Sequence, residues 1–277
     1  MQISRLAAGI PLLLMLGGAA PQPAPAIADG FAPHRAVYEI GLARTRDGSG
    51  VTSADGRMVF ELTGSACAGY TMRQRMVVSI VDSDGSPGIL DFRVSTFETG
   101  EGDLYRFTSR TIMNDEVLES LGGVATRKSS GVEVALAKPS DATVALARDT
   151  LFPTQHLRAI LGAARADQRF LAAEIYEGGG EGETSDSAAA MIGHKLGPST
   201  DGLLRTGVTS WPISVGYFSD KEKKEGFGEE LPSYQVSFTL YENGVTNDLV
   251  MDYGDYALSG RLQTIEPIEP EACPSPH

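Results

Sequence analysis

The sequence predicts an all-β fold with one main α-helix, in which a large antiparallel sheet curves into an open-barrel cup. From Pro33 onward, runs of alternating apolar and polar residues are separated by clusters of Gly, Asp, Ser and Asn, the pattern of strands joined by turns. Only one segment has the periodicity of an amphipathic helix. The pattern indicates roughly a dozen or more strands with no dividing linker; because a flat sheet of that size is unfavourable, we expect it to curve until it nearly closes.

The first half of the chain is predicted to be an antiparallel meander. In the run 34–46 (HRAVYEIGLARTR), Ala36, Tyr38, Ile40 and Leu42 alternate on one face. Further strand-like runs cover 56–65, 69–83, 88–99, 103–114, 124–127 and 131–136. The short connections between them suit hairpins, whereas parallel strands would need longer crossovers.

The segment 151–167 (LFPTQHLRAILGAARAD) is predicted to be the helix. Its apolar residues from Leu157 to Ala164 recur at helical spacing, and Pro153 lies at a suitable start. We expect its apolar stripe to pack against a sheet face or to fill an open end of the curved sheet. Strand-like runs resume at 170–178, 188–197, 210–219, 233–245 and 247–268. Within them, Asn243-Gly244 predicts a hairpin with a type I′ turn.

Residues 1–28 have the pattern of a secretory signal peptide. Arg5 is followed by a short apolar run and a Pro-rich patch, and Ala26-Ile27-Ala28 fits a cleavage site before Asp29. We therefore expect a mature chain of residues 29–277 that forms a single domain and is exported, with an uncleaved anchor as the alternative. No other run approaches the roughly 18 continuous apolar residues of a membrane-spanning helix, so no span is expected after cleavage.

The chain contains only two cysteines, Cys67 in a Gly-rich turn and Cys273 in the Pro-rich tail. Two thiols in an exported protein usually form one disulfide, so we expect Cys67 to bond to Cys273 and to enclose most of the mature chain. The alternatives are two free thiols or a disulfide to a second molecule through the tail. A zinc site is disfavoured because no CxxC and no His pair accompanies these cysteines.

Composition and charge exclude several classes of function. Hydrophobic residues make up 42% of the chain, which is enough for a core and argues against general disorder. The formal net charge of −13 disfavours nucleic acid as a partner and attachment to anionic lipid through a polybasic segment. Binding of a membrane component through shape or apolar contact is still compatible with this charge.

No motif in the sequence indicates a reaction. The histidines, His34, His156, His194 and His277, form no HExxH motif and no metal-binding pair, and the sequence contains no GxSxG or SxxK. We therefore assign no catalytic residue, no metal ligand and no cofactor.

The stretch 176–187 (YEGGGEGETSDS) concentrates carboxylates on a Gly-rich segment. Its glycine spacing does not fit GxGxxG, and it lacks the Lys and Ser/Thr of a phosphate-binding loop. We interpret it as an acidic hairpin loop, with a weak calcium site as the alternative.

Trp211 is the only tryptophan of the chain and begins the run SWPISVGYF, in which Val215 and Tyr217 alternate behind it. Packing in the core is the simpler interpretation. The alternative is that Trp211 and Tyr217 line an apolar cavity, since curved sheets of this size often enclose space for a ligand.

These features together resemble the EipB family of cell-envelope integrity proteins, which are secreted to the periplasm of alphaproteobacteria. The resemblance rests on the leader, on PHRAVYEIGL and GSACAGY near the start, on FPTQHLRAILGAA and GVTSWPISVGYF, and on the C-terminal EACP. It implies a β-spiral partly filled by one helix, a disulfide between Cys67 and Cys273, and a role in envelope stress resistance. The spiral is similar to that of lipoprotein carrier proteins, and the family has no established enzymatic activity.

From these observations we expect a non-enzymatic periplasmic protein that supports envelope integrity. Its cup would bind a lipid-like or cell-wall ligand, or an envelope protein partner. The alternative is an enzyme, a hydrolase or transferase acting on cell-wall or lipid material. That alternative requires acids such as Glu98 or Glu177, or His156, to meet around a pocket with shifted protonation. A third hypothesis is a scaffold that contacts partners through an apolar outer patch.

Overall fold

A computed structural model describes residues 30–179, 182–200, 202, 204–218 and 231–273, and these form one 14-stranded antiparallel sheet with one helix. The predicted signal peptide, residues 1–28, lies outside the described residues. The elements are β1 (His34–Thr45), β2 (Val51–Ser65), β3 (Gly69–Asp82), β4 (Pro87–Glu98), β5 (Leu104–Met113), β6 (Glu116–Lys128), β7 (Gly131–Lys138), β8 (Ala142–Leu146), α1 (Pro153–Arg165), β9 (Phe170–Ile175), β10 (Asp186–Ile192), β11 (Ser210–Phe218), β12 (Tyr234–Tyr241), β13 (Thr246–Asp252) and β14 (Tyr256–Pro267).

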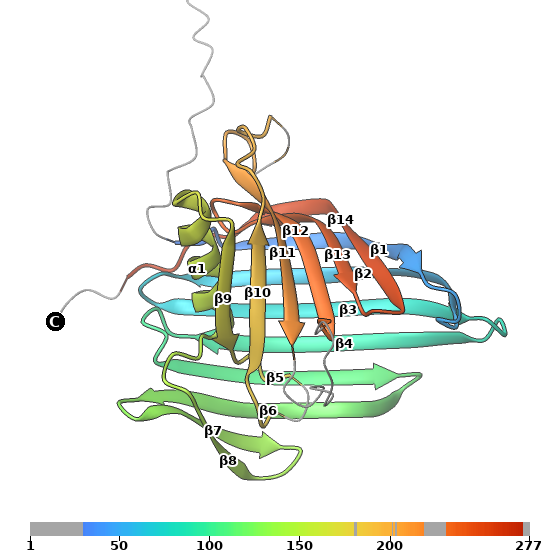
Figure 1. The fold of residues 1–277 in the computed structure, drawn as a ribbon, viewed down its shortest axis with the longest axis horizontal. Helices are drawn as coiled ribbons and strands as arrows, with labels where there is room; N and C mark the ends of the chain where they lie inside the picture. The colour runs from blue at the N-terminus through green and yellow to red at the C-terminus, as the bar shows by residue number, and fades with distance from the viewer. Residues whose placement is uncertain (1–29, 180–181, 201, 203, 219–230, 274–277) are drawn as a thin grey trace, which may run out of the picture.

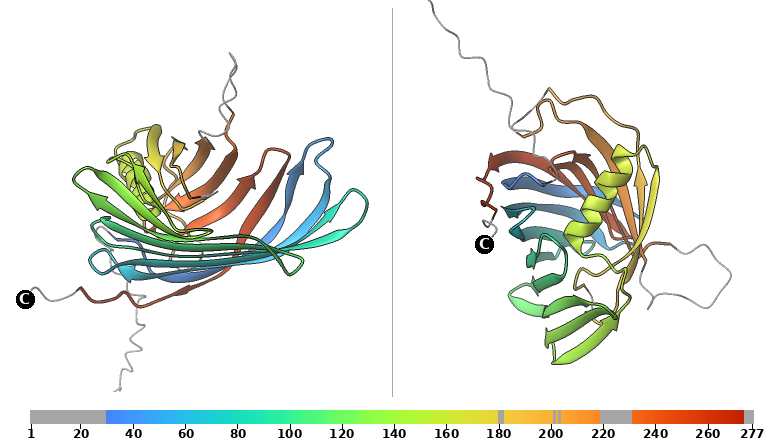
Figure 2. Two further views of the ribbon diagram at one scale, coloured as in Figure 1. Left: turned by 90° about the horizontal axis from the view of Figure 1, so that it is seen from below. Right: turned by 90° about the vertical axis from the view of Figure 1, so that its left-hand side faces the viewer.

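The sheet is curled but not closed. Its strand order runs from β8 through β1, continues with β14, and ends at β9, so that β8 and β9 are the free edges. Figures 1 and 2 show that β9–β11 cross in front of β2–β5, with α1 between the two layers. The predicted all-β cup with one main helix is therefore confirmed, and the pairing of β1 with β14 joins its two halves.

Helix α1 holds the two layers together. Its apolar stripe predicted from the sequence is buried through Ile160, Leu161, Ala163 and Ala164. These residues share one cluster with side chains from both layers: Leu62, Tyr70, Ile175, Ala188, Ala190, Ile192, Trp211, Ile213, Val215 and Leu240. The helix therefore supplies the apolar surface that the inner face of a single curled sheet would otherwise expose to water.

Alternation along the strands separates an inner face, which we define as the face directed toward α1, from an outer face. On β5, Tyr105 and Phe107 are buried, whereas the intervening Arg106 and Thr108 are exposed. Successive side chains of a strand point to opposite faces, so the register assigns the face of every paired residue. A second cluster fills the inner face around Tyr38, and a third lies around Tyr105.

The hairpin at Asn243-Gly244 differs from the predicted type I′ turn. That turn needs positive φ at both residues, but only Gly244 has it, at +85°. The amide of Gly244 donates to the carbonyl of Tyr241, which is the hydrogen bond of a type I turn followed by a left-handed glycine. The side chain of Asn243 explains the change, because its Nδ2 donates to the Leu204 carbonyl at 2.6 Å and its Oδ1 accepts from the Val245 amide.

The type I′ geometry occurs instead between β5 and β6. Asn114 and Asp115 have φ values of +48° and +67°, and they directly connect the paired residues Met113 and Glu116. Asn and Asp tolerate this region because their short polar side chains can hydrogen-bond locally.

The strand β8 was also not predicted, since its few residues carry little pattern.

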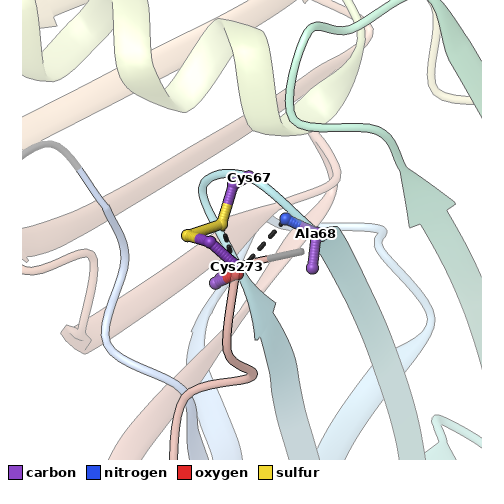
Figure 3. The surroundings of a disulfide bond; sticks show 4 residues. Cys67, Ala68 and Cys273 are labelled. Atoms are coloured by element: carbon purple, nitrogen blue, oxygen red, sulfur yellow. Dashed lines mark hydrogen bonds between the residues drawn. A yellow bond between two sulfur atoms is a disulfide. The ribbon is translucent and has the colours of Figure 1, made fainter. Parts of the chain in front are cut away.

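Cys67 and Cys273 form the predicted disulfide, with their Cα atoms 5.5 Å apart and a sequence separation of 206. Figure 3 shows that it joins the turn between β2 and β3 to the segment that follows β14. The hydroxyl of Ser65 supports this turn by accepting a hydrogen bond from the Ala68 amide at 3.2 Å. The backbone amide of Glu271 also donates to the Gly64 carbonyl, so the tail is held beside β2.

Candidate functional site on the inner face

A row of tyrosines crosses the inner face at one end of β11–β14. The row consists of Tyr217, Tyr234, Tyr253 and Tyr256, whose successive ring centroids lie 5.6, 5.1 and 5.2 Å apart. Tyr217 is paired with Tyr234 across the β11–β12 ladder, while Tyr253 and Tyr256 flank the β13–β14 turn. Register thus brings together residues that are far apart in sequence, and we call them the tyrosine row.

The rings of the tyrosine row are packed against each other but not fully covered. Tyr253 is 38% exposed, and the other rings are partly buried. Desolvation raises the pKa of Tyr253 to about 12 and also raises the pKa of Tyr217, of Tyr234 and of Tyr256. The hydroxyls therefore stay neutral at physiological pH. Such a surface offers apolar ring faces and neutral hydrogen-bonding groups, which is the combination suited to an amphiphilic ligand.

Glu177 lies between the two layers near the tyrosine row. Tyr105 of β5 donates its hydroxyl to the Glu177 carbonyl at 3.0 Å, and the charge of Glu177 acts on the hydroxyls of Tyr217 and Tyr234. Solvent reaches the Glu177 side chain, but the surrounding layers desolvate it. This desolvation, with a smaller contribution from Asp186, raises the pKa of Glu177 to about 7. Glu177 therefore exchanges its proton near neutral pH.

Trp211 lies at the other end of β11 and is only 2% exposed. It belongs to the cluster that contacts α1, which agrees with the simpler interpretation of core packing. Tyr217 is six positions further along the strand, about 20 Å away. The structure thus does not bring the two predicted ligand residues together, and a ligand on the inner face can reach Tyr217 without displacing the core around Trp211. Ligand contact by either residue stays a prediction.

Glu98, a candidate acid, caps the helix. It is 2% exposed, and its carboxylate oxygens accept hydrogen bonds from the amides of Thr154 and Gln155 at 2.7 and 3.1 Å. Free amides at a helix N-terminus favour an anion. Desolvation nevertheless raises the pKa of Glu98, against the lowering effect of these hydrogen bonds and of Arg158. The sequence pattern of the helix did not reveal this role, because the cap comes from β4.

Arg127 of β6 fixes the same end of α1. Its Nη2 donates to the Thr150 carbonyl and to the Gln155 side chain at 2.8 and 2.9 Å. Its guanidinium carbon also lies 5.0 Å from the centroid of the Phe152 ring. The N-terminus of α1 is therefore held from β4 and β6 by polar contacts, while its apolar stripe packs elsewhere.

His156 is buried in the first turn of α1 and is 4% exposed. Desolvation lowers its pKa to about 4, so it is neutral in the folded protein. Glu98, Glu177 and His156 all have shifted pKa values, but Glu98 and His156 lie in packed core and only Glu177 reaches solvent. The structure does not bring the three around one accessible pocket.

Within the described ranges, no cluster of three or more His, Cys, Asp or Glu side chains is arranged to hold a metal ion. In the acidic stretch 176–187, the Tyr176 hydroxyl donates a hydrogen bond to the Gly182 carbonyl at 2.9 Å. Among the described residues, no helix is long and apolar enough to cross a membrane.

Comparison with known proteins adds a family and a fold. A family model described as EipB-like matches residues 25–269 of the chain. The cell envelope integrity protein EipB of Brucella abortus (strain 2308) is 35% identical over 239 residues, which cover 84% of this chain and 83% of that protein. The crystal structure of a beta-barrel-like protein of domain of unknown function DUF1849 from Brucella abortus matches with a TM-score of 0.78 and 30% identity, covering 86% of this chain and 99% of that chain.

Proposed function

The chain belongs to the EipB-like family, as its motifs indicated, and from this premise we propose that it maintains the integrity of the cell envelope from a periplasmic location. The name of the Brucella relative supports the envelope role. The disulfide supports a location outside the cytoplasm, because thiols are kept reduced inside it.

The protein acts by binding a lipid-like or other amphiphilic envelope ligand on its inner face. The observation that carries this proposal is the tyrosine row, whose ring faces are partly exposed inside the curl of the sheet. An apolar chain packs against these rings and releases water, while neutral hydroxyls hydrogen-bond to a polar group at its end. An envelope protein partner would meet the same surface with an apolar segment.

The test is a fluorescence titration of the full chain with dansyl-undecanoic acid. The variant Tyr253→Ala removes the most exposed ring of the row, and Phe170→Ala is its matched control, since Phe170 is 54% exposed and lies on the outer side of β9. We expect Tyr253→Ala to weaken binding about tenfold, whereas Phe170→Ala binds as the parent does. Absence of saturable binding to the parent protein would refute the ligand-binding proposal.

The envelope role is tested separately by deleting the gene in its own host and measuring growth in detergent. The parent gene should restore growth, and the Tyr253→Ala gene should restore it less well than the Phe170→Ala gene. If the deletion strain tolerates detergent as well as its parent strain, the envelope role is wrong.

A second candidate function is an enzyme that modifies envelope material. Glu177 favours it, because a carboxyl with a pKa of about 7 that solvent can reach is suited to general acid–base catalysis. If Glu177→Gln abolishes complementation in the deletion strain while ligand binding persists, the enzyme is favoured over the binding protein.

A further inference from the structure

A pocket of about 830 Å³ lies on the outer face of β4–β7. Its side chains alternate with those of the core, because Phe107 and Leu121 point inward and Arg106, Thr108 and Ser120 point outward. This pocket is therefore separated by the sheet from the tyrosine row. We call it the outer groove.

Local irregularities of the sheet form the outer groove. The β6–β7 ladder shifts register between Gly122 and Gly123, and such bulges bend a strand and strengthen its twist. The floor is then made of small residues, with Gly122 beside the bulged Ala137 of β7 and with Ala135 opposite Val124. A methyl group added to Gly122 would meet the Thr108 Cγ2 atom at 3.5 Å, an ordinary contact, so that no side chain fills this position.

The cations that line the outer groove are Arg93, Arg106, Arg110 and Lys138, and none of the described residues that line it is a carboxylate. The overall charge of the protein is −13, so a groove lined by cations alone runs against the general composition. Arg93 is paired with Asp91 at 2.6 Å. In the described part of the chain, Arg106, Arg110 and Lys138 make no ion pair, and all three are exposed.

The register directs these three cations toward one point. Arg106 and Arg110 are four residues apart on β5, about 14 Å, with Thr108 midway between them. Thr108 is paired with Gly122, and Gly122 with Lys138, which places Lys138 about 10 Å from the middle of that line. Long side chains from three sides can therefore meet above Gly122, where the floor is open.

We propose that the outer groove binds a ligand carrying two or more phosphate groups. A tetrahedral phosphate presents oxygens in several directions and can accept hydrogen bonds from cations on three sides, whereas a carboxylate presents only two oxygens in one plane. The hydroxyls of Ser95, Thr108 and Ser120 add further donors. A volume of about 830 Å³ leaves room for more than a single phosphate. An anionic lipid headgroup and a soluble polyphosphate share this chemistry.

The experiment is calorimetric titration of the full chain at low salt with inorganic tripolyphosphate, and in parallel a sedimentation assay with phosphatidylcholine vesicles that contain cardiolipin. The test variant is Arg106→Gln/Arg110→Gln. The matched control is Arg35→Gln/Arg57→Gln, which removes the same charge from exposed positions on the same face outside the groove. A third variant, Gly122→Val, fills the floor without changing the charge.

We expect the parent protein and the matched control to bind with affinities within about twofold of each other, and the Arg106→Gln/Arg110→Gln variant to bind about tenfold or more weakly. Gly122→Val should weaken binding similarly. Binding to vesicles alone identifies a lipid headgroup, and binding to tripolyphosphate alone identifies a soluble ligand. Absence of binding to both probes, or equal losses in the groove variant and the control, would overturn the proposal. None of these variants alters the tyrosine row, so failure here leaves the amphiphile proposal standing.

Discussion

Alternate residues of β5 have different roles: those on the inner face pack in the core, and those on the outer face are exposed. Tyr105 and Phe107 point inward and are 1% and 3% exposed, whereas Arg106, Thr108 and Arg110 point outward into solvent. The inner residues stack on each other, with ring centroids 5.5 Å apart. The outer residues line a groove and have few partners. The difference shows that a single strand can separate the residues that stabilise the fold from those that are free to bind.

The same separation explains why the candidate sites lie where they do. On the inner face, α1 packs into one of three buried clusters, and the tyrosine row at one end of β11–β14 is only partly buried. In the part of the chain that the structure describes, the strands form one sheet and α1 packs on its inner face, so the chemistry of the outer face is set by the register and by the bulge at Gly122. Stability therefore depends on the inner face and on the disulfide that joins the β2–β3 turn to the segment after β14, and the outer face can vary without loss of the fold.

The largest expected effect comes from truncating the inner face of β5. Phe107→Ala removes a buried ring that stacks on Tyr105, and we expect the free energy of unfolding to fall by about 3–5 kcal/mol. Thr108→Ala, its neighbour on the outer face, should change it by no more than about 0.5 kcal/mol. Urea unfolding measures both. Similar losses in the two variants would refute the assignment of the faces.

Loss of the disulfide is expected to have the next largest effect on stability. Cys67→Ser and Cys273→Ser each remove the same cross-link, and we expect each to cost about 2–5 kcal/mol of unfolding free energy. Thermal unfolding with and without reductant checks this, since reductant should lower the midpoint of the parent protein and leave both variants unchanged. A loss seen only in the Cys67 variant would contradict the pairing.

A smaller effect should follow from pH. The folded pKa of His156 is lowered to about 4, below its ordinary value of 6.5, so the unfolded chain binds this proton more tightly. The contribution of neutral His156 to the free energy of unfolding is present above pH 6.5 and is lost as pH falls toward 4. We therefore expect the free energy of unfolding to fall by about 2 kcal/mol between pH 7 and pH 5. His156→Leu should lack this loss relative to the parent protein in urea unfolding at the two pH values. An identical pH dependence in both proteins would show that His156 is not buried neutral.

Glu177 should make the free energy of unfolding change with pH in the opposite direction over the same pH range. Because its folded pKa is raised to about 7, the folded protein holds this proton more tightly, and stability falls as pH rises from 4.5 toward 7. Comparing His156→Leu and Glu177→Gln with the parent protein at the same pH separates the contribution of His156 from that of Glu177.

The strands and the helix could be predicted because their signals are local. Alternation in the segment 34–46 and helical spacing from Leu157 to Ala164 depend on residues close in sequence, and both elements are present. The hairpin at Asn243 was predicted with the wrong turn because its side chain bonds to Leu204, a partner that the dipeptide does not reveal. Local pattern thus predicted the elements better than their connections.

The sites could not be predicted to the same extent. Tyr217 was singled out, but its neighbours in the tyrosine row come from other strands and meet only through register. The outer groove depends on a bulge at Gly122 and on the pairing of Gly122 with Lys138, and neither follows from local periodicity. Glu98 was named only as an acid that the alternative enzyme hypothesis would need, and its capping role could not be predicted because its contact with the amides of α1 spans 56 residues.

The most direct test of the central claim is photocrosslinking with a diazirine-bearing fatty acid, followed by mapping of the labelled peptides. If an amphiphile binds on the inner face at the tyrosine row, the label is found in β11–β14, on residues 210–218 and 234–267, and Tyr253→Ala reduces it while Phe170→Ala does not. Label concentrated on β4–β7, or unchanged by Tyr253→Ala, would contradict the account.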